Sequence, residues 1–407
     1  MKILLANKFY YRRGGAEVYV LNLEELLKAH GHKVAVFSMQ HPENLPNRWS
    51  SFWPSEIEIR PSFNLPKTLA RPFGSKEVKR KFRELLDVFR PDVVHANNLH
   101  THLSPVIMEM AKARGIRTVW TVHDCKCLCP RYLCLRNGAI CESCFMHGWH
   151  RRRQDLLHCI RHKCMKDSFA YSLIGYLEAL HWHPLRLQKM TDAFICPSQF
   201  MTEKMVQGGF SSSDMYILNN FIDAGKCRVD AFDKDDYYCY VGRLSEEKGL
   251  KTLIKAANKA PQRKLLIIGD GVARKELQGM AMNHITFMGK MTWEEVKQTV
   301  SKVRFTVIPS ECYENCPLSV IESLCLGTPV LGARIGGIPE LIDEPSAGLT
   351  FESGNVDDLE SKIRQMFEAD FDYERIALRA QFKFDAETYY QRIMDVYLKK
   401  SIENIVH

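Results

Sequence analysis

The chain has 407 residues, with 56 Lys and Arg against 48 Asp and Glu, and its formal net charge at pH 7 is +8. This length allows two domains with a substantial core in each, and an apolar content of 45% is typical of a globular protein. The positive charge is too modest to demand a nucleic-acid partner, and no apolar run reaches the ~20 residues that would cross a bilayer.

The first half of the chain alternates short apolar segments with amphipathic ones. Strands are expected at residues 2–6, 33–37, 93–95, 118–122, 193–196 and 215–218, and helices at 16–29, 76–89, 104–113 and 199–207. Residues 40–74 are rich in Pro, Asn and Trp without a clear period, and are expected to be mostly loops. The alternation predicts a parallel, doubly wound sheet.

A second alternating set follows a polar stretch at 224–236, which we interpret as a linker. Strands are expected at 237–242, 264–268, 285–287, 305–309, 329–332 and 349–351, and helices at 250–258, 273–280, 293–301, 339–342 and 386–400. The predicted fold class is therefore α/β, with two doubly wound, Rossmann-like parallel-sheet domains facing across a cleft. Ligands of such sheets bind at the carboxyl ends of the strands.

Two glutamates flank the start of one predicted helix in the second half. An apolar strand runs into a turn that holds Glu314, and the helix that begins near Pro317 carries Glu322 in its second turn. The forward-facing amides of Leu318 and Ser319 would form an anion site at the positive end of that helix. A carboxylate there would repel a bare phosphate but could accept hydrogen bonds from sugar hydroxyls, so both glutamates can border one pocket. The alternative is that they are ordinary partners of the helix dipole.

Three further loops follow predicted strands. Gly14 and Gly15 lead from the first strand into a helix but form neither a G-x-G-x-x-G fingerprint nor a P-loop, so turn geometry alone could explain them. Arg243 and Lys248 share one loop, and a guanidinium with an ammonium suits a diphosphate, although both could be solvated surface cations. His123 follows a strand and could face the cleft, or serve a structural role beside its neighbour Asp.

Taken in this order, the motifs resemble those of the GT-B glycosyltransferases of family four, the retaining, nucleotide-sugar-dependent group. The resemblance runs from the early glycine loop through Arg243 and Lys248, the E-x7-E pair of Glu314 and Glu322, and two glycine motifs at 327–330 and 336–340. Only the combination is specific, because each glycine motif is common by itself.

The resemblance implies a role for each of these residues. Arg243 and Lys248 would neutralise the departing donor diphosphate with help from the amides of Leu318 and Ser319, while the early glycine loop approaches the phosphates and the acceptor.

The same resemblance implies that Glu322 holds the nucleotide ribose and that Glu314 contacts hydroxyls of the transferred sugar. His123 would contact the donor sugar from the first domain. The family needs no metal for catalysis and retains configuration, so we name no general base. The expected domains are an acceptor-side domain at 1–224, a nucleotide-sugar domain at 235–380, and a C-terminal helix at 386–407 that crosses back to the first domain.

A cysteine-rich insertion interrupts the first domain at residues 125–164, with eight of the fourteen cysteines of the chain. Cys141 and Cys144 with Cys159 and Cys164 have the paired spacing of a tetrahedral thiolate site, which predicts a structural zinc. An iron–sulfur cluster or reduced, unligated cysteines are the alternatives. The insertion is expected to shape acceptor choice, with residues 151–153 meeting a lipid diphosphate.

The sequence thus predicts a hexosyltransferase that uses a nucleotide-diphosphate sugar and a glycan or lipid-linked acceptor in surface polysaccharide biosynthesis. Because residues 1–6 are too short for a signal peptide, the expected location is cytoplasmic, with peripheral contact at the inner membrane face. The alternatives are a nucleotide-sugar epimerase of the same architecture and a non-catalytic sugar-nucleotide-binding module.

Overall fold

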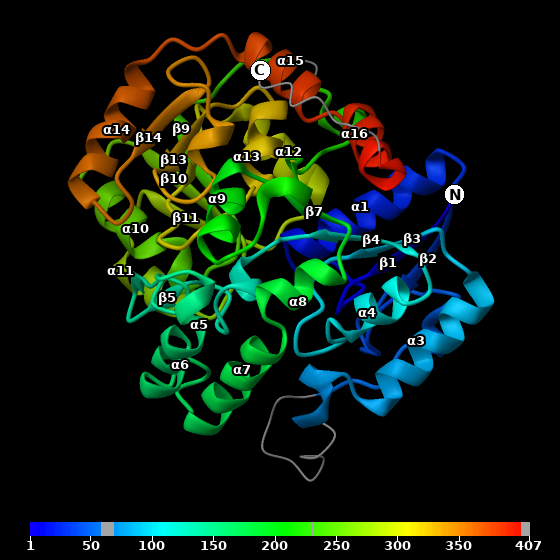
Figure 1. Cartoon of the computed structure of the whole chain (residues 1–407). Helices are drawn as coiled ribbons and strands as arrows, with labels where there is room; N and C mark the ends of the chain where they lie inside the picture. The colour runs from blue at the N-terminus through cyan, green and yellow to red at the C-terminus, as the bar shows by residue number, and fades with distance from the viewer. Residues whose placement is uncertain (58–68, 230, 400–407) are drawn as a thin grey trace. The chain divides into compact units, whose positions relative to one another are not determined.

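The computed structural model describes residues 1–57, 69–229 and 231–399, which divide into two compact units. The first unit contains Met1–Cys134, Cys141–Leu218 and the chain from Tyr390 onward, and the second contains Asn219–Tyr389 with the short segment Leu135–Ile140. Each unit is built on one six-stranded parallel sheet. Figure 1 shows both sheets with helices around them.

The sheet of the first unit has the order β2-β1-β3-β4-β7-β8. Its strands are β1 (Lys2–Ala6), β2 (Lys33–Phe37), β3 (Val93–Ala96), β4 (Arg117–Thr121), β7 (Ala193–Cys196) and β8 (Met215–Ile217). Most residues of the first five are buried, which is why they appear in the sequence as continuous apolar runs. The strand order reverses between β1 and β3, so this is the topological switch point of the sheet.

The helices that accompany this sheet are α1 (Gly15–Ala29), α3 (Lys76–Phe89), α4 (Val106–Lys112) and α9 (Gln199–Gln207). Helix α3 begins where the Ser75 side chain accepts a hydrogen bond from the Val78 amide, and it buries one apolar stripe. The region predicted as loops contains the 3₁₀ helices η1 (Ser50–Phe52) and η2 (Arg71–Phe73), and its residues 58–68 lie outside the described residues.

The insertion between β4 and β7 folds into short pieces. They are η3 (Cys125–Cys127), β5 (Leu135–Arg136), β6 (Ala139–Ile140), η4 (Trp149–Arg151), α5 (Arg152–Asp155), α6 (Leu157–Arg161), α7 (Phe169–His181) and α8 (Pro184–Lys189). Helices α5, α6 and α7 lie together, as Figure 1 shows. The sequence pattern predicted neither α7 nor α8.

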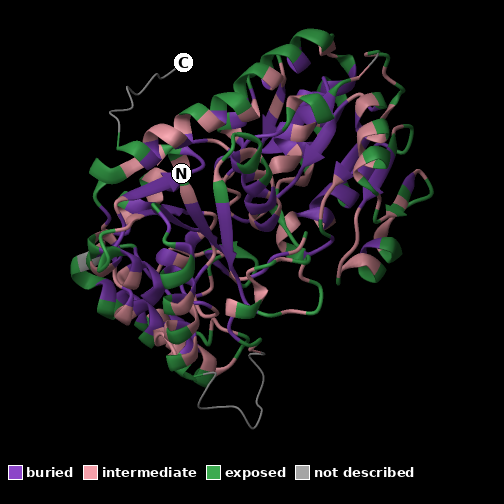
Figure 2. Cartoon of the chain, turned by 90° about the vertical axis from the view of Figure 1, so that its right-hand side faces the viewer, coloured by how far each residue is buried: buried purple, intermediate pink, exposed green. Residues whose placement is uncertain are grey.

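The sheet of the second unit has the order β11-β10-β9-β12-β13-β14, with its switch point between β9 and β12. Its strands are β9 (Tyr237–Val241), β10 (Lys264–Ile268), β11 (Ile285–Gly289), β12 (Thr306–Ile308), β13 (Val330–Ala333) and β14 (Gly348–Phe351). The accompanying helices are α10 (Leu250–Asn258), α11 (Arg274–Met280), α12 (Trp293–Lys302), α13 (Leu318–Cys325), α14 (Val356–Glu368) and α15 (Tyr373–Lys383). Figure 2 shows the buried strands of both sheets in purple.

The predicted fold class, two doubly wound parallel-sheet domains, is confirmed. Helices α14 and α15 were not predicted, and the short helix expected at 339–342 is the 3₁₀ helix η8 (Pro339–Leu341). Part of the expected linker is packed, because η6 (Ala224–Cys227) places Cys227 fully buried in the core of the second unit.

The C-terminal helix α16 (Ala386–Leu398) changes unit along its length. From Tyr390 onward it belongs to the first unit, where the Tyr390 hydroxyl lies 2.8 Å from His32 Nε2 and the Tyr397 hydroxyl lies 2.7 Å from His95 Nδ1. The predicted helix extended to Lys400, which lies outside the described residues.

Candidate functional site

Two loops flank the switch point of the second sheet. The loop at 242–249 follows β9 and contains the 3₁₀ helix η7 (Glu246–Lys248), and the loop at 309–317 follows β12 and leads into α13. Adjacent strands whose crossovers leave in opposite directions open a crevice at this point, where doubly wound sheets bind their ligands. The residues predicted to bind the donor in this unit lie on these two loops or on the first two turns of α13. They are Arg243, Lys248, Glu314, Leu318, Ser319 and Glu322.

The two loops touch through their backbones. Gly249 has φ +66°, and a Cβ at this position would lie 1.8 Å from the carbonyl oxygen of Pro309. The Glu311 amide donates to the Glu247 carbonyl at 3.0 Å beside this contact. Only glycine permits this approach, so the sequence holds the loops in one fixed arrangement.

An ion pair joins the loops at their centre. Lys248 Nζ donates to Glu314 Oε1, and the same oxygen accepts a 2.7 Å hydrogen bond from Ser310 Oγ. The side chains of Lys248 and Glu314 are 23% and 14% exposed. Burial opposes the charge of Lys248, but the Glu314 carboxylate outweighs it and raises the pKa of the ammonium, so Lys248 is charged at neutral pH.

The glycine loop after β13 holds the backbone of Glu314. The Gly337 amide donates to the Glu314 carbonyl at 2.7 Å. Gly336 has φ +60°, and a Cβ there would lie 2.1 Å from the same oxygen. The position of Glu314 is therefore fixed both by its side-chain partners and by a backbone contact that a larger residue would break.

Arg243 has a different partner from Lys248. Its guanidinium donates to Glu247 Oε1 at 2.9 Å, and the Arg243 side chain is 62% exposed. Glu247 also accepts from Ser245 Oγ at 2.7 Å; burial acts against its charge, but these partners keep the pKa of the carboxyl below its usual value. Each predicted cation thus has its own carboxylate, and only Lys248 contacts Glu314.

The amino end of α13 carries the two predicted amide donors. Pro317 caps the helix and Leu318 is its first residue, so Pro317 lies one position earlier than a first helical residue. Asn220 anchors the preceding turn, because its side-chain amide donates to the Cys316 carbonyl at 2.6 Å. The Leu318 and Ser319 amides lie in the first helical turn, where no carbonyl of the same helix can accept from them.

A mainly apolar pocket lies beside the first two turns of α13. Its lining comprises Val241, Trp293, Val296, Val300, Thr306, Ile308, Ser319, Glu322, Ser323 and Leu326. Glu314 does not line it, so the two glutamates do not share this pocket. The indole Nε1 of Trp293 is buried and has no hydrogen-bond partner among the described residues, which is costly unless something else occupies that position.

In the first unit, His123 is held as a neutral imidazole. The Asn97 amide donates through Nδ2 to the Ala6 carbonyl at 3.5 Å, which turns its Oδ1 toward His123 Nε2 at 2.8 Å. Nε2 therefore carries the proton, and Nδ1 is left as an acceptor. Burial, assisted by the Lys8 ammonium, lowers the pKa of His123 to about 3.

The early glycines are not explained by turn geometry. Gly14 caps α1 in an extended conformation, with φ −163°. A Cβ on Gly15 would meet nothing within 4 Å. The fold thus leaves open space at the start of α1, which is what close approach of a ligand to the backbone requires.

The thiols of the insertion cluster in a way that differs from the predicted set. Cys129 has hydrogen-bonded thiol neighbours in Cys134 and Cys144, which lower its pKa, whereas the contact with Cys164 raises the pKa of Cys159. Among the residues that the structure describes, no three or more His, Cys, Asp or Glu side chains are arranged to hold a metal ion. The zinc set of Cys141, Cys144, Cys159 and Cys164 stays a prediction, and no chemistry is assigned to it.

Several residues of the site were missed by sequence reasoning. Ser310 and Glu247 lie in the two predicted loops but carried no motif. Asn97 directly follows β3 at the switch point of the first sheet, so its position could have identified it. Trp293 begins a helix, where an aromatic residue gives no indication of a pocket.

Two family models together match nearly all of the chain. The model described as Glycosyltransferase Family 4 matches residues 13–226, and the model described as Glycosyl transferases group 1 matches residues 226–383. The first of these alone covers more than half of the chain.

Individual relatives and structures agree with this match. An uncharacterized 42.6 kDa protein in the cps region of Klebsiella pneumoniae is 25% identical over 359 residues, covering 84% of this chain and 87% of that protein. The lipopolysaccharide core biosynthesis glycosyltransferase LpsE of Rhizobium meliloti is 24% identical over 247 residues, covering 58% and 70%. The crystal structure of Anabaena HepE in complex with UDP-glucose superposes with a TM-score of 0.67 at 16% identity, covering 98% of this chain and 100% of that one.

Proposed function

Because this chain belongs to the group 1 glycosyltransferases of family 4, we propose that it transfers a hexose-type sugar from a nucleotide-diphosphate sugar with retention of configuration. The observation that carries the proposal is the contact between Lys248 and Glu314 at the switch point of the second sheet. A cation for a diphosphate and a carboxylate for sugar hydroxyls meet there, beside the amino end of α13.

In the proposed reaction, the bond between the anomeric carbon and the diphosphate oxygen breaks, and a bond to an acceptor hydroxyl oxygen forms on the same face. The acceptor proton passes to an oxygen of the leaving diphosphate, so no side chain is needed as a general base. Lys248 stabilises the negative charge that grows on the diphosphate, and the Leu318 and Ser319 amides assist it through the dipole of α13.

Lys248 is paired with Glu314 before any donor arrives. When a diphosphate binds, the ammonium can share its donors between phosphate and carboxylate, because it has three N–H groups. Glu314 is then an acceptor for hydroxyls of the transferred sugar. Arg243, which is more exposed, would leave Glu247 to reach the distal phosphate.

Each remaining residue of the site is assigned to one part of the donor. We assign Glu322 to the ribose hydroxyls, because it lines the pocket beside α13. The buried N–H of Trp293 in the same pocket is a hydrogen-bond donor that the nucleoside could satisfy. His123 is assigned to a sugar hydroxyl, whose proton its neutral Nδ1 can accept, and the Gly14 and Gly15 loop is assigned to the phosphates and acceptor.

We further propose that the product is part of a surface polysaccharide and that the acceptor is a glycan or a lipid-linked glycan. The support is the Klebsiella pneumoniae relative in the cps region and the lipopolysaccharide core enzyme of Rhizobium meliloti. Catalysis is proposed to need no metal, since side-chain cations neutralise the diphosphate; full activity in excess EDTA is the expected result.

A ligand screen by thermal shift tests the donor assignment. Wild-type protein, Glu322→Gln and the control Glu294→Gln, an exposed position on α12, are heated with UDP-, GDP- and ADP-sugars. One nucleotide should stabilise the wild type and the control by about 2.7 kcal/mol at a concentration 100 times its Kd, and Glu322→Gln should lose most of that gain. Equal stabilisation of all three proteins would contradict the role of Glu322.

Product analysis separates transfer from the other possibilities. When a transferase releases nucleoside diphosphate, an equal amount of sugar appears either on the acceptor or as free sugar from transfer to water. An epimerase would convert one nucleotide sugar into another without releasing nucleotide, and a binding module would show stabilisation with no turnover. Either of the last two results would contradict the proposed function.

A further inference from the structure

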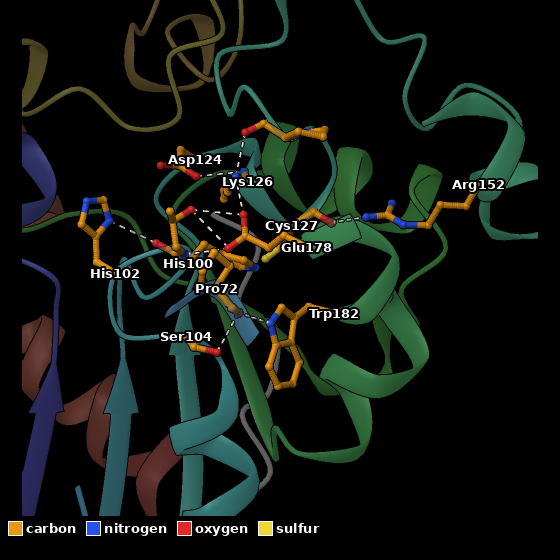
Figure 3. Close-up of polar contacts among 12 residues, drawn as sticks. Pro72, His100, His102, Ser104, Asp124, Lys126, Cys127, Arg152, Glu178 and Trp182 are labelled. Atoms are coloured by element: carbon orange, nitrogen blue, oxygen red, sulfur yellow. Dashed lines mark hydrogen bonds and ion pairs between the residues drawn. The ribbon is translucent and has the colours of Figure 1, made fainter. Parts of the chain in front are cut away.

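The orientation of α7 is fixed by a buried carboxylate. Glu178 is the only Asp, Glu, Lys or Arg residue of this helix, and it is 2% exposed. It accepts hydrogen bonds from the Thr101 amide at 2.7 Å and pairs with Lys126 at 3.1 Å. Figure 3 shows Glu178 pointing toward Lys126 within the first unit. A buried ion pair with hydrogen bonds holds one face of α7 inward.

The inward face of α7 is otherwise small and tightly packed. Ser172 Oγ accepts from the Met165 amide at 3.0 Å, and a Cβ on Gly175 would lie 3.2 Å from Pro130. At the carboxyl end of the helix, Trp182 Nε1 donates to the Pro72 carbonyl at 2.7 Å. The polar and small residues of α7 thus face the protein.

The outward face of α7 is apolar, which is the reverse of an ordinary surface helix. Phe169 and Leu177 are 57% and 45% exposed. Leu173 and Leu180 fall on the same face at i+4 and i+11 from Phe169 and are partly exposed. Two more large apolar side chains are exposed on the helices before and after α7 in the chain, Leu157 of α6 at 49% and Leu185 of α8 at 39%.

Basic side chains flank this apolar face along the chain. The exposed members between α5 and α8 are Arg153, Arg161, Lys163, Lys166 and Lys189. The same stretch has three acidic residues. Asp155 and Glu178 are buried, with 5% and 2% of their surface exposed, so Asp167 is the only exposed acidic residue in it. This stretch therefore exposes large apolar side chains together with five basic residues and one acidic residue.

We propose that the outer face of α7, together with Leu157 and Leu185, docks on the surface of an anionic lipid bilayer. Apolar side chains would enter the boundary between headgroups and acyl chains, while the flanking Lys and Arg residues bind lipid phosphates. The 13 residues of α7 span about 20 Å, and among the described residues no helix is long and apolar enough to cross a membrane. The helix therefore lies along the surface.

A bilayer fits this face better than a protein partner does. The exposed apolar residues are single large side chains on successive helices, and the exposed charged residues of the same stretch are basic except for Asp167. An anionic lipid surface complements both features without needing a matched shape. The inference goes beyond the proposed function and does not depend on it.

Vesicle flotation of the full chain tests the proposal. Wild type should float with phosphatidylcholine vesicles that contain about a third phosphatidylglycerol and should bind pure phosphatidylcholine much more weakly. Phe169→Ser with Leu177→Ser should weaken binding roughly tenfold or more. The matched control is Leu378→Ser with Phe382→Ser on α15, two side chains that are 61% and 83% exposed, and it should bind as the wild type does.

A charge-matched pair of variants tests the electrostatic part. Replacing Arg161 and Lys163 by Gln should weaken binding roughly fivefold for each cation lost, whereas the same change at Lys76 and Arg83 of α3, both exposed, should not. Unfolding temperatures and nucleotide binding, expected to be unchanged in every variant, establish that fold and donor site are intact.

Three outcomes would overturn the proposal. In the first, the folded wild type does not float with anionic vesicles; in the second, the α7 variant floats as well as the control. In the third, ultracentrifugation without lipid shows a wild-type dimer that the α7 variant abolishes, which would identify a second copy of the chain as the occupant. None of these results bears on transfer to a water-soluble acceptor, so the proposed function is tested separately.

Discussion

The ion pair between Lys248 and Glu314 gives the sharpest test of the site, because it joins two loops that are 66 residues apart. The perturbation is a double-mutant cycle of Lys248→Met, Glu314→Gln and the double variant. Both side chains are mostly buried, at 23% and 14% exposure. Removing one partner of a fully buried pair costs about 3–5 kcal/mol, whereas an exposed pair contributes at most about 1 kcal/mol.

We therefore expect Lys248→Met to lower the unfolding free energy by about 2–3 kcal/mol, discounted from the buried limit for partial exposure. Glu314 keeps the hydrogen bond from Ser310 in that variant, which limits the loss. The double variant should recover part of the stability, since neither charge is then left unpaired, and the coupling should be about 1–2 kcal/mol.

Calorimetry on the full chain is the suitable assay, because two units need not unfold together. For a unit of this size, each kcal/mol shifts the Tm by roughly 2–4 °C, so Lys248→Met should lower one transition by about 4–12 °C. The transition of the other unit should stay in place. Additive effects of the two substitutions would refute the pairing.

The pH dependence of this pair has a defined direction. The folded-state pKa of Lys248 is raised, so the pair contributes fully below the ordinary lysine pKa and its contribution is lost as the pH rises through the folded-state value. Across neutral pH the difference between wild type and Lys248→Met should therefore be constant. A difference that disappears near pH 7 would contradict this account.

Three further predictions address other parts of the chain. Gly336→Ala should cost roughly 2–3 kcal/mol by calorimetry and should also reduce turnover, because a Cβ at φ +60° is strained and displaces Glu314; unchanged turnover would refute the positioning role. Burial lowers the pKa of His95 to about 3, so His95 by itself should contribute up to about 1.4 kcal/mol per pH unit to the loss of stability as urea unfolding is followed from pH 6 to pH 4, in addition to the similar contribution of His123; in His95→Gln the fall should be shallower by that amount. Trp293→Phe should leave the unfolding free energy of the ligand-free protein within about 1 kcal/mol but weaken nucleotide binding roughly 2–10-fold by calorimetric titration; equal affinity would exclude Trp293 from the donor site.

The strands of both sheets could be predicted because parallel strands are buried on two faces. Segment 264–268, for example, is an apolar run with only its first residue exposed, and it forms β10 at those bounds. Helix α14 was not predicted, although its sequence contains an N-cap residue. The Asn355 side chain accepts hydrogen bonds from the amides of Asp357 and Asp358. This cap is a local signal from which the start of α14 can be predicted.

Helix α7 could not be predicted in the same way. Its inward face is polar and small, with Ser172, Gly175 and Glu178, and its outward face is apolar. The apolar face of a periodic helix is normally assigned to the core. For α7 this rule would bury the face that is exposed. The contacts of Glu178 with Thr101 and Lys126 connect distant parts of the chain, and no local pattern encodes them.

The loops of the candidate site could be predicted, but their contacts could not. Lys248 and Glu314 each follow a strand, and strand order alone brings β9 beside β12. Arg243 pairs with Glu247 within its own loop, whereas the pairing of Lys248 with Glu314 joins two loops that pack closely where Gly249 approaches Pro309. Such a contact follows from the folded loops and leaves no spacing rule in the sequence.

The measurement that tests the central claim most directly is transfer of radiolabelled sugar from the stabilising nucleotide sugar to an acceptor extract, by wild type and by Glu314→Gln. The account predicts transfer by the wild type and a loss of roughly a hundredfold in Glu314→Gln, with nucleotide binding retained through Glu322. Equal transfer by the two proteins would contradict the assignment of Glu314 to the reacting sugar, and no transfer by a folded wild type that binds the donor would contradict the proposed function itself.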